Sequence, residues 1–203
     1  MAAEHYFTST PDGDLRPRRI TARLAGRDLE LTTAGGVFSP GHVDLGTRVL
    51  LDAVPEPPAS GDLLDLGCGW GPIALSLALG APDARVWAVD FNQRALELVR
   101  RNCEELGVTS VNAVLPEDVP ADVRFDAIWS NPPIRIGKEE LHALLERWLP
   151  RLAPGADGWL VVQRNLGSDS LQKWLVEAFD ERLEVERVGS AKGFRVLRTT
   201  RSA

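Results

Sequence analysis

The chain has 203 residues, of which 44% are hydrophobic and 26% charged, and its formal net charge is −6. This composition is that of an ordinary globular protein, large enough to bury one substantial core. The negative net charge argues against tight, indiscriminate binding of nucleic acid. No apolar run is long enough to span a bilayer, no secretory signal is visible, and Cys68 and Cys103 form no metal or redox pair. We therefore expect a cytoplasmic protein that binds no metal ion.

Basic residues nevertheless gather in two acid-free segments. The first, between residues 15 and 27, holds Arg16, Arg18, Arg19, Arg23 and Arg27, and the second, near the C-terminus, holds Lys192, Arg195, Arg198 and Arg201. If the two segments meet in space, they form a local phosphate-binding face on an acidic body. The alternative is that both are simply solvated faces of strands.

The N-terminal part predicts a small β extension followed by a helix. Residues 19–24 and 29–33 partly alternate between apolar and polar, with a turn expected at 26–28. Residues 45–54 have helical apolar spacing, and Asp44 is placed to cap that helix. A proline-rich linker at 55–61 follows. We expect residues 1–54 to pack on a core formed by residues 61–203, the two parts making one structural domain.

From residue 62 onward, predicted strands alternate with predicted helices. We expect strands at 63–66, 85–89, 110–115, 125–130 and 158–162, helices at 72–79, 93–106, 138–152 and 168–179, and a closing antiparallel pair at 183–188 and 194–199. This order predicts an α/β fold with a doubly wound, mostly parallel, seven-stranded sheet and helices on both faces. Ligands of such sheets bind beyond the carboxyl ends of the strands.

A glycine-rich loop, Asp65 to Pro72, follows the first strand of this sheet. Its glycines let the backbone turn sharply and approach a ligand, and Pro72 suits the first turn of a helix. The spacing G-x-G-x-G differs from the dinucleotide fingerprint G-x-G-x-x-G and favours a ligand without a pyrophosphate at the helix tip. Asp90 ends the next strand, where a carboxylate can accept both hydroxyls of a ribose. The alternative is a strand–turn–helix corner that binds nothing.

The segment Asn131-Pro132-Pro133-Ile134 follows the strand predicted at 125–130. Each proline lacks an N–H and has a fixed φ, so the segment can accept hydrogen bonds but hardly donate them. Acceptors of this kind can hold an –NH2 group and aim its lone pair. The alternative is an ordinary loop, since Asn and Pro are common turn residues.

Three segments together carry a resemblance to a known family. Residues 64–72 (LDLGCGWGP), 88–90 (AVD) and 130–133 (SNPP) resemble class I S-adenosylmethionine-dependent methyltransferases, which have a Rossmann-like fold. Further segments resemble the small methyltransferase-domain family, which includes ribosomal RNA guanine-N2 methyltransferases of the small subunit. They are His5-Tyr6-Phe7, residues 36–41 (GVFSPG), Asp44, Gly46-Thr47, residues 131–138 (NPPIRIGK) and residues 192–197 (KGFRVL).

The resemblance implies a role for each matching residue. Asp65 would lie near the methionine amino group of the cofactor, Asp90 would hold the ribose hydroxyls, and Phe91 or Asn92 would border the adenine. The full implied cofactor set is Asp65, Gly67, Cys68, Gly69, Gly71, Asp90, Phe91 and Asn131, with Cys68 as a small filler between two glycines. The implied catalytic set is Asn131, Pro132, Pro133 and Ile134, in which the Asn131 amide oxygen and the Pro132 carbonyl hold the target amine. The expected substrate contacts are Phe38 and, from their position just beyond the Asn-Pro-Pro turn, Arg135 and Lys138, for which the alternative is a solvated helix start.

The implied activity is methyl transfer to the exocyclic amine of a base in RNA, guanine N2 in small-subunit ribosomal RNA being the leading substrate. The segment that contacts the adenine amine in many relatives is replaced here by Leu115-Pro116, where Glu117 or Asp118 could substitute. Ile134 stands where related enzymes often have an aromatic residue, and it stacks less well on a base. The alternatives are methylation of a protein glutamine amide or an adenine amine, or a non-catalytic RNA-binding relative. We expect RNA or a ribosomal subunit as partner, no membrane association, and a monomer or weak dimer.

Overall fold

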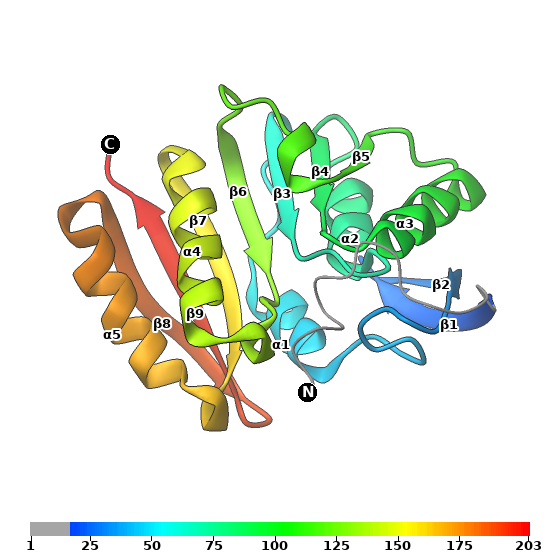
Figure 1. The fold of residues 1–203 in the computed structure, drawn as a ribbon. Helices are drawn as coiled ribbons and strands as arrows, with labels where there is room; N and C mark the ends of the chain where they lie inside the picture. Colours follow the sequence, from blue (N-terminus) through cyan, green and yellow to red (C-terminus); the bar gives the residue numbers. More distant parts are fainter. Residues whose placement is uncertain (1–16) are drawn as a thin grey trace.

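The main sheet has seven strands and carries helices on both faces (Figure 1). The computed structural model describes residues 17–203, so Arg16 and the segment His5-Tyr6-Phe7 lie outside the described residues. The strands lie in the order β5-β4-β3-β6-β7-β9-β8, with the bounds β3 (Asp62–Leu66), β4 (Arg85–Val89), β5 (Val111–Val114), β6 (Phe125–Ser130), β7 (Leu152–Gln163), β8 (Leu183–Ala191) and β9 (Phe194–Arg201). Strands β3 to β7 are parallel, and β9 runs antiparallel to both its neighbours. The predicted doubly wound, mostly parallel sheet is confirmed.

Each face of the sheet has its own hydrophobic core. The helices are α1 (Leu45–Ala53), α2 (Pro72–Gly80), α3 (Gln93–Leu106), α4 (Lys138–Trp148) and α5 (Ser168–Phe179). Strand side chains alternate between the faces, so that Leu63 joins the core under α1, α2 and α3, and Leu64 joins the core under α4 and α5. Short 3₁₀ turns are η1 (Pro116–Asp118), η2 (Ile134–Ile136), η3 (Leu149–Arg151), η4 (Arg164–Leu166) and η5 (Asp180–Arg182). Within residues 17–203, no helix has the length and apolarity needed to cross a membrane.

Helix α4 is shorter than the sequence predicted. It ends at Trp148 and continues as the 3₁₀ turn η3, whereas the apolar spacing suggested a helix through Leu152. Pro150 lacks the backbone donor that another helical turn requires, which explains the early end. Leu152 instead begins β7, and its fully buried side chain continues the apolar stripe of α4 from a different element.

A separate two-stranded hairpin precedes the main sheet. It consists of β1 (Arg18–Leu24) and β2 (Arg27–Thr33), which are antiparallel. The turn is formed by Ala25 and Gly26, both with positive φ (47° and 75°), so the expected turn at 26–28 was placed too late. Two central residues with positive φ suit the twist of a tight hairpin. The hairpin packs on α2 and α3 through buried residues such as Leu24 and Leu31.

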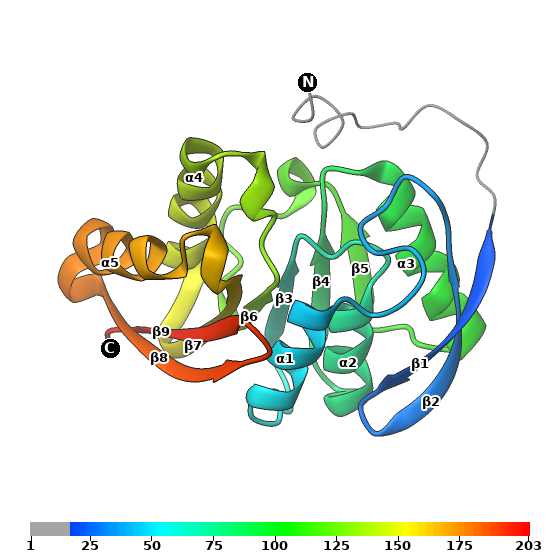
Figure 2. The ribbon, with the colours of Figure 1, turned by 90° about the horizontal axis from the view of Figure 1, so that it is seen from below.

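The two basic segments do not form one face in the described structure. The β1–β2 hairpin lies beside α3, at one end of the molecule, and β8 and β9 form the opposite end (Figures 1 and 2). Arg19, which belongs to the first segment, is ion-paired with Glu105 of α3. Arg198, which belongs to the second, is ion-paired with Glu186 of β8. The hypothesis that these segments meet to bind phosphate is therefore wrong for the described residues.

Candidate active site

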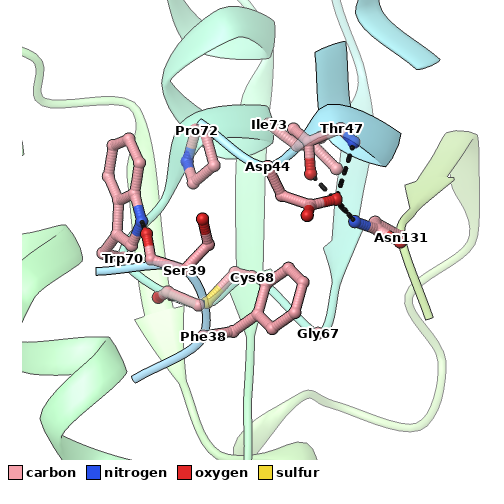
Figure 3. Close-up of a pocket in the computed structure, with 11 residues that line it drawn as sticks. Phe38, Ser39, Asp44, Thr47, Gly67, Cys68, Trp70, Pro72, Ile73 and Asn131 are labelled. Carbon is pink, nitrogen blue, oxygen red and sulfur yellow. Dashed lines mark hydrogen bonds between the residues drawn. The ribbon is translucent and has the colours of Figure 1, made fainter. Parts of the chain in front are cut away.

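The candidate site lies where the carboxyl ends of β3, β4 and β6 meet. From β3 the chain adds β4 and β5 on one side and β6 and β7 on the other, so this edge contains the topological switch point of the sheet. A pocket there is lined by Phe38, Ser39, Asp44, Thr47, Gly67, Cys68, Gly69, Trp70, Pro72, Ile73 and Asn131 (Figure 3). The lining comes from the loop after β2, the start of α1, the glycine loop and the end of β6. The fold thus brings the glycine loop and Asn131 together, as the sequence predicted.

The glycine loop is a tight turn held by the end of β4. The backbone N–H groups of Gly67 and Cys68 both donate to the Val89 carbonyl, at 2.8 and 3.0 Å. Gly71 has a φ of 98°, and a Cβ there would lie 3.0 Å from Cγ2 of Val99 on α3. Both backbone conformation and space therefore require glycine at position 71. Pro72 then begins α2, as expected from its place after the loop.

Asp90 connects the glycine loop to the start of α3. Its Oδ2 accepts a hydrogen bond from the Gly69 N–H at 2.9 Å, and its Oδ1 accepts one from the Asn92 N–H at 2.9 Å. Burial raises the pKa of the Asp90 carboxyl, and the backbone donors act in the opposite direction. Phe91 supplies a third backbone donor to this carboxylate, which still has capacity to accept a hydroxyl from a diol.

Asp65 is fully buried below the glycine loop and is not among the residues that line the pocket. Its Oδ2 accepts from the Ala74 N–H at 2.8 Å, which satisfies a donor in the first turn of α2. Its Oδ1 is buried without a hydrogen-bond partner in the described structure. Burial raises the pKa of this carboxyl well above its usual range, and the neighbouring Asp90 raises it further. Such an oxygen can accept a hydrogen bond from a cationic donor.

The side chain of Asn131 is held from two sides (Figure 3). Its Nδ2 donates to Asp44 Oδ2 and to Thr47 Oγ1, both at 3.0 Å. A carboxylate can only accept, so the amide nitrogen must face Asp44, and the amide oxygen is left for another donor. Asp44 also caps α1 by accepting from the Gly46 N–H at 2.8 Å, which confirms its predicted capping role.

The contact between Asp44 and Asn131 was not predicted from the sequence. The two residues are 87 positions apart, and the cap signal at Asp44 concerns only its own helix. Asp44 and Thr47 were noted as parts of the family resemblance, which was the available signal for a shared role. The structure adds both to the site as the residues that orient Asn131.

The Pro132 carbonyl is already engaged in the turn. It accepts from the Ile134 N–H at 2.8 Å across Pro133, whose φ of −74° and ψ of 74° describe an inverse γ-turn. One lone pair of the expected acceptor is therefore used internally, and one remains for a substrate. The ring of Pro133 faces the glycine loop, since a Cβ at Gly67 would lie 3.7 Å from its Cδ.

The loop after β2 closes one side of the pocket. The buried Trp70 indole donates to the Ser39 carbonyl at 3.1 Å, and the Asn92 side chain donates to the Gly36 carbonyl at 2.8 Å. Phe38 is half exposed in the pocket wall. Phe91 is exposed as well but does not line this pocket.

The remaining candidates differ in how close they lie to this pocket. Cys68 lines it, and burial raises the pKa of its thiol well above the usual range, which suits a filler and not a thiolate nucleophile. Lys138 lies outside the pocket, exposed at the start of α4, and Arg135 belongs to η2. Among residues 17–203, no group of His, Cys, Asp and Glu side chains is arranged to hold a metal ion.

Comparison with known proteins identifies relatives along nearly the whole chain. The sequence model of the methyltransferase small domain family matches residues 28–198. The uncharacterized protein YbxB of Bacillus subtilis is 37% identical over 199 residues, covering 97% of this chain and 98% of YbxB. Ribosomal RNA small subunit methyltransferase C of Chromohalobacter salexigens is 35% identical over 185 residues, which cover 87% of this chain and 54% of that protein.

A solved structure is similar over the same region. The T. thermophilus 16S rRNA N2 methyltransferase RsmC, in complex with AdoMet and guanosine, superposes with a TM-score of 0.80 at 27% sequence identity. The match covers 95% of this chain and 52% of that protein. The chain thus spans about half the length of these ribosomal RNA methyltransferases, and nearly all of YbxB.

Proposed function

Because the chain belongs to the methyltransferase small domain family, we propose that it methylates the exocyclic amine of a base in RNA, using S-adenosylmethionine. Guanine N2 in small-subunit ribosomal RNA is the proposed target. Relatives named ribosomal RNA small subunit methyltransferase C, and the RsmC structure with AdoMet and guanosine, support this assignment. The observation that carries it is the orientation of Asn131 beside the glycine loop.

The glycine-loop side of the pocket fits the proposed cofactor. The unpartnered Oδ1 of Asp65 is suited to a cationic amino group, and the Asp90 carboxylate is suited to a ribose diol. Gly67, Gly69 and Gly71 would lie along the methionine and ribose portion, with Cys68 filling the space between. Phe91, exposed directly after Asp90, would border the adenine. When bound, S-adenosylmethionine supplies a methyl group on a sulfonium, which is already a strong electrophile.

The Asn-Pro-Pro side of the pocket would hold the target amine. The lone pair of an exocyclic nitrogen is shared with the ring of the base, so the nitrogen is a poor nucleophile. Asn131 Oδ1 and the free lone pair of the Pro132 carbonyl would each accept one N–H of that amine. Holding both hydrogens favours a more tetrahedral nitrogen, aims its lone pair, and stabilises the positive charge that develops on it.

Pro133 and Ile134 would complete this half of the site through where they lie, and neither would form a hydrogen bond with the target amine. Pro133 fixes the turn against Gly67, and Ile134 would press on the base from beyond the turn. Phe38 would contact the base from the opposite wall, and Arg135 and Lys138 would contact the RNA outside the pocket. A paired base hides its amine, so the target would be single-stranded or flipped out of a duplex.

Transfer of tritium from labelled S-adenosylmethionine tests the proposal. The substrates are ribosomal subunits, naked ribosomal RNA and total protein, each from a strain lacking this enzyme. We expect label in RNA, and nucleoside mass spectrometry of that RNA to show methylation at guanine N2. Label in protein glutamine would support the amide alternative, and label at an adenine amine would move the target to the other base. No transfer to any of the three, by protein that binds no S-adenosylmethionine, would support a non-catalytic role.

A further inference from the structure

A second pocket lies directly beyond Ile134, between α4 and α5. It is lined by Ile134, Lys138, Leu141, His142, Val162, Leu166, Gly167, Ser170 and Leu171. Its floor is aliphatic, since Leu141, Val162 and Leu171 belong to the core under these helices. Ile134 is three residues after Asn131, so the Asn-Pro-Pro-Ile turn separates this pocket from the candidate methyl-transfer site.

A flat aromatic pair flanks the second pocket. The His142 ring stacks on the Trp174 ring, with the centroids 3.5 Å apart and the planes 15° from parallel. Burial lowers the pKa of His142, and the positive charge of Lys138 lowers it further. The lowered pKa favours the neutral imidazole, and the Glu146 carboxylate acts in the opposite direction.

One cation lines this pocket, and two more lie in the segments beside it. Lys138, Arg164 and Lys192 are exposed, and none has a carboxylate partner among residues 17–203. The backbone N–H of Arg164 donates to the Gly193 carbonyl at 2.9 Å. This hydrogen bond places the β8–β9 turn, which contains Lys192, beside η4. Elsewhere, Arg85 and Arg101 are ion-paired with Asp62 and Glu105. The unpaired charge in and beside the pocket is therefore free to bind an anion.

Two of the acids near these cations are engaged elsewhere. Asp169, at the start of α5, is ion-paired with the largely buried Arg195. The carboxylate of Glu140 lies close over Gly137, so it is drawn back toward the turn before α4. Glu139 is exposed and directly follows Lys138 in the chain.

The cation-bearing rim is continuous with the candidate active site. Phe194, directly after the Lys192-Gly193 turn, packs on Gly46, where a Cβ would lie 2.8 Å from its ring. Gly46 follows the α1 cap residue Asp44, which holds Asn131. Asn131, the start of α1, the β8–β9 turn and η4 are therefore successive neighbours along one edge of the molecule. The second pocket, with Lys138 and Ile134, joins η4 back to Asn131.

We propose that this second pocket binds the nucleotide next to the methylated one, in a single RNA strand whose phosphates contact Lys138, Arg164 and Lys192. The inference rests on the proposed function, because it continues the strand that presents its base to Asn131. The flanking base lies against Ile134 and the aliphatic floor, and the backbone follows the three cations. An RNA strand carries both flat rings and phosphates, which suits an edge that combines an aliphatic pocket with exposed cations. A peptide of acidic residues alone would bring no flat ring to the aliphatic floor.

Fluorescence anisotropy of a labelled, short single-stranded RNA with one central guanine tests this proposal over a range of salt concentrations. Lys138→Gln, Arg164→Gln and Lys192→Gln should each weaken binding and lower the slope of log K against log salt by about 0.7, the value for one phosphate contact in a single strand. Leu166→Ser should weaken binding with an unchanged slope, since it removes only apolar contact. Arg187→Gln is the matched control, because Arg187 is exposed on β8 without a carboxylate partner among the described residues and lies outside this edge.

The outcomes separate this proposal from the proposed function. Binding is measured without methyl transfer, so loss of RNA affinity in the three cation variants supports the pocket even if no methylated product is found. If the wild-type protein methylates RNA and the three variants keep its RNA affinity and salt slope, the proposed role of the second pocket is wrong. The methyl-transfer assignment then stands. Equal competition by an acidic peptide at the same salt concentration would also overturn it. Each variant is first checked for unchanged thermal unfolding and S-adenosylmethionine affinity.

Discussion

The amide nitrogen of Asn131 lies 3.0 Å from the carboxylate of Asp44, a residue that also caps the helix following it. One carboxylate therefore ends a helix and orients the residue proposed to hold the substrate. Because the amide nitrogen is occupied by Asp44 and Thr47, the amide oxygen is set in its orientation before any substrate binds. A preorganised acceptor loses no energy to reorientation during the reaction.

Replacing Asn131 with alanine should abolish most turnover. The Asn131→Ala variant loses one of the two proposed acceptors for the target amine, and removal of one such preorganised group typically lowers kcat by roughly a hundredfold or more. Binding of S-adenosylmethionine, measured by calorimetry, should stay close to wild type because the glycine loop and Asp90 are untouched. Methyl transfer near the wild-type rate would remove Asn131 from the catalytic role.

Thr47 allows a cleaner test of how Asn131 is oriented. Thr47→Val keeps the shape of this buried side chain and removes the Oγ1 acceptor, which lies 3.0 Å from Asn131 Nδ2. A neutral hydrogen bond contributes about 1 kcal/mol, so kcat should fall by roughly fivefold to tenfold, with KM for S-adenosylmethionine unchanged. Thr47→Ser restores the hydroxyl and should recover the rate. A purely structural role for Thr47 predicts lower thermal stability in Thr47→Val with no effect on kcat.

Asp90 should control cofactor affinity in a pH-dependent way. Asp90→Asn loses the charged acceptor proposed for the ribose and should weaken S-adenosylmethionine binding by roughly tenfold or more, since hydrogen bonds to a charged group contribute about 1.5–3 kcal/mol. Burial raises the pKa of this carboxyl, so wild-type affinity should fall on acidification at a higher pH than for an ordinary aspartate. Asp83→Asn, in the exposed turn after α2, is the matched control. Equal affinity of Asp90→Asn and wild type would exclude the ribose role.

The buried carboxyl of Asp65 should lower the stability of the fold while contributing to S-adenosylmethionine binding. Its pKa is raised in the folded state, so ionisation costs folding free energy, and this cost grows as pH rises from the unfolded pKa, near 3.8, through the folded one. Asp65→Asn keeps an acceptor for the Ala74 N–H and removes the ionisation. We expect its melting temperature to exceed that of wild type by a margin that widens with pH, while S-adenosylmethionine affinity falls. A margin independent of pH would contradict the burial of an ionised Asp65.

Much of the fold followed from local patterns in the sequence. Apolar periodicity placed the strand at 125–130 and the helices at 93–106 and 168–179 with the bounds that the structure shows. These elements were predictable because their signals are complete within a few turns of chain. The hairpin turn at Ala25-Gly26 and the end of α4 were misplaced, because single residues, an alanine with positive φ and Pro150, decide them.

The sequence by itself determined the family, the glycine loop, the strand-end Asp90 and the Asn-Pro-Pro turn, since each is a short motif whose chemistry is local. Only the tertiary structure decided which groups surround them. It placed Asp44 and Thr47 on Asn131, left Asp65 Oδ1 buried without a partner, and separated the two basic segments. Contacts between residues tens of positions apart depend on strand order and on how helices pack, and no local pattern encodes them.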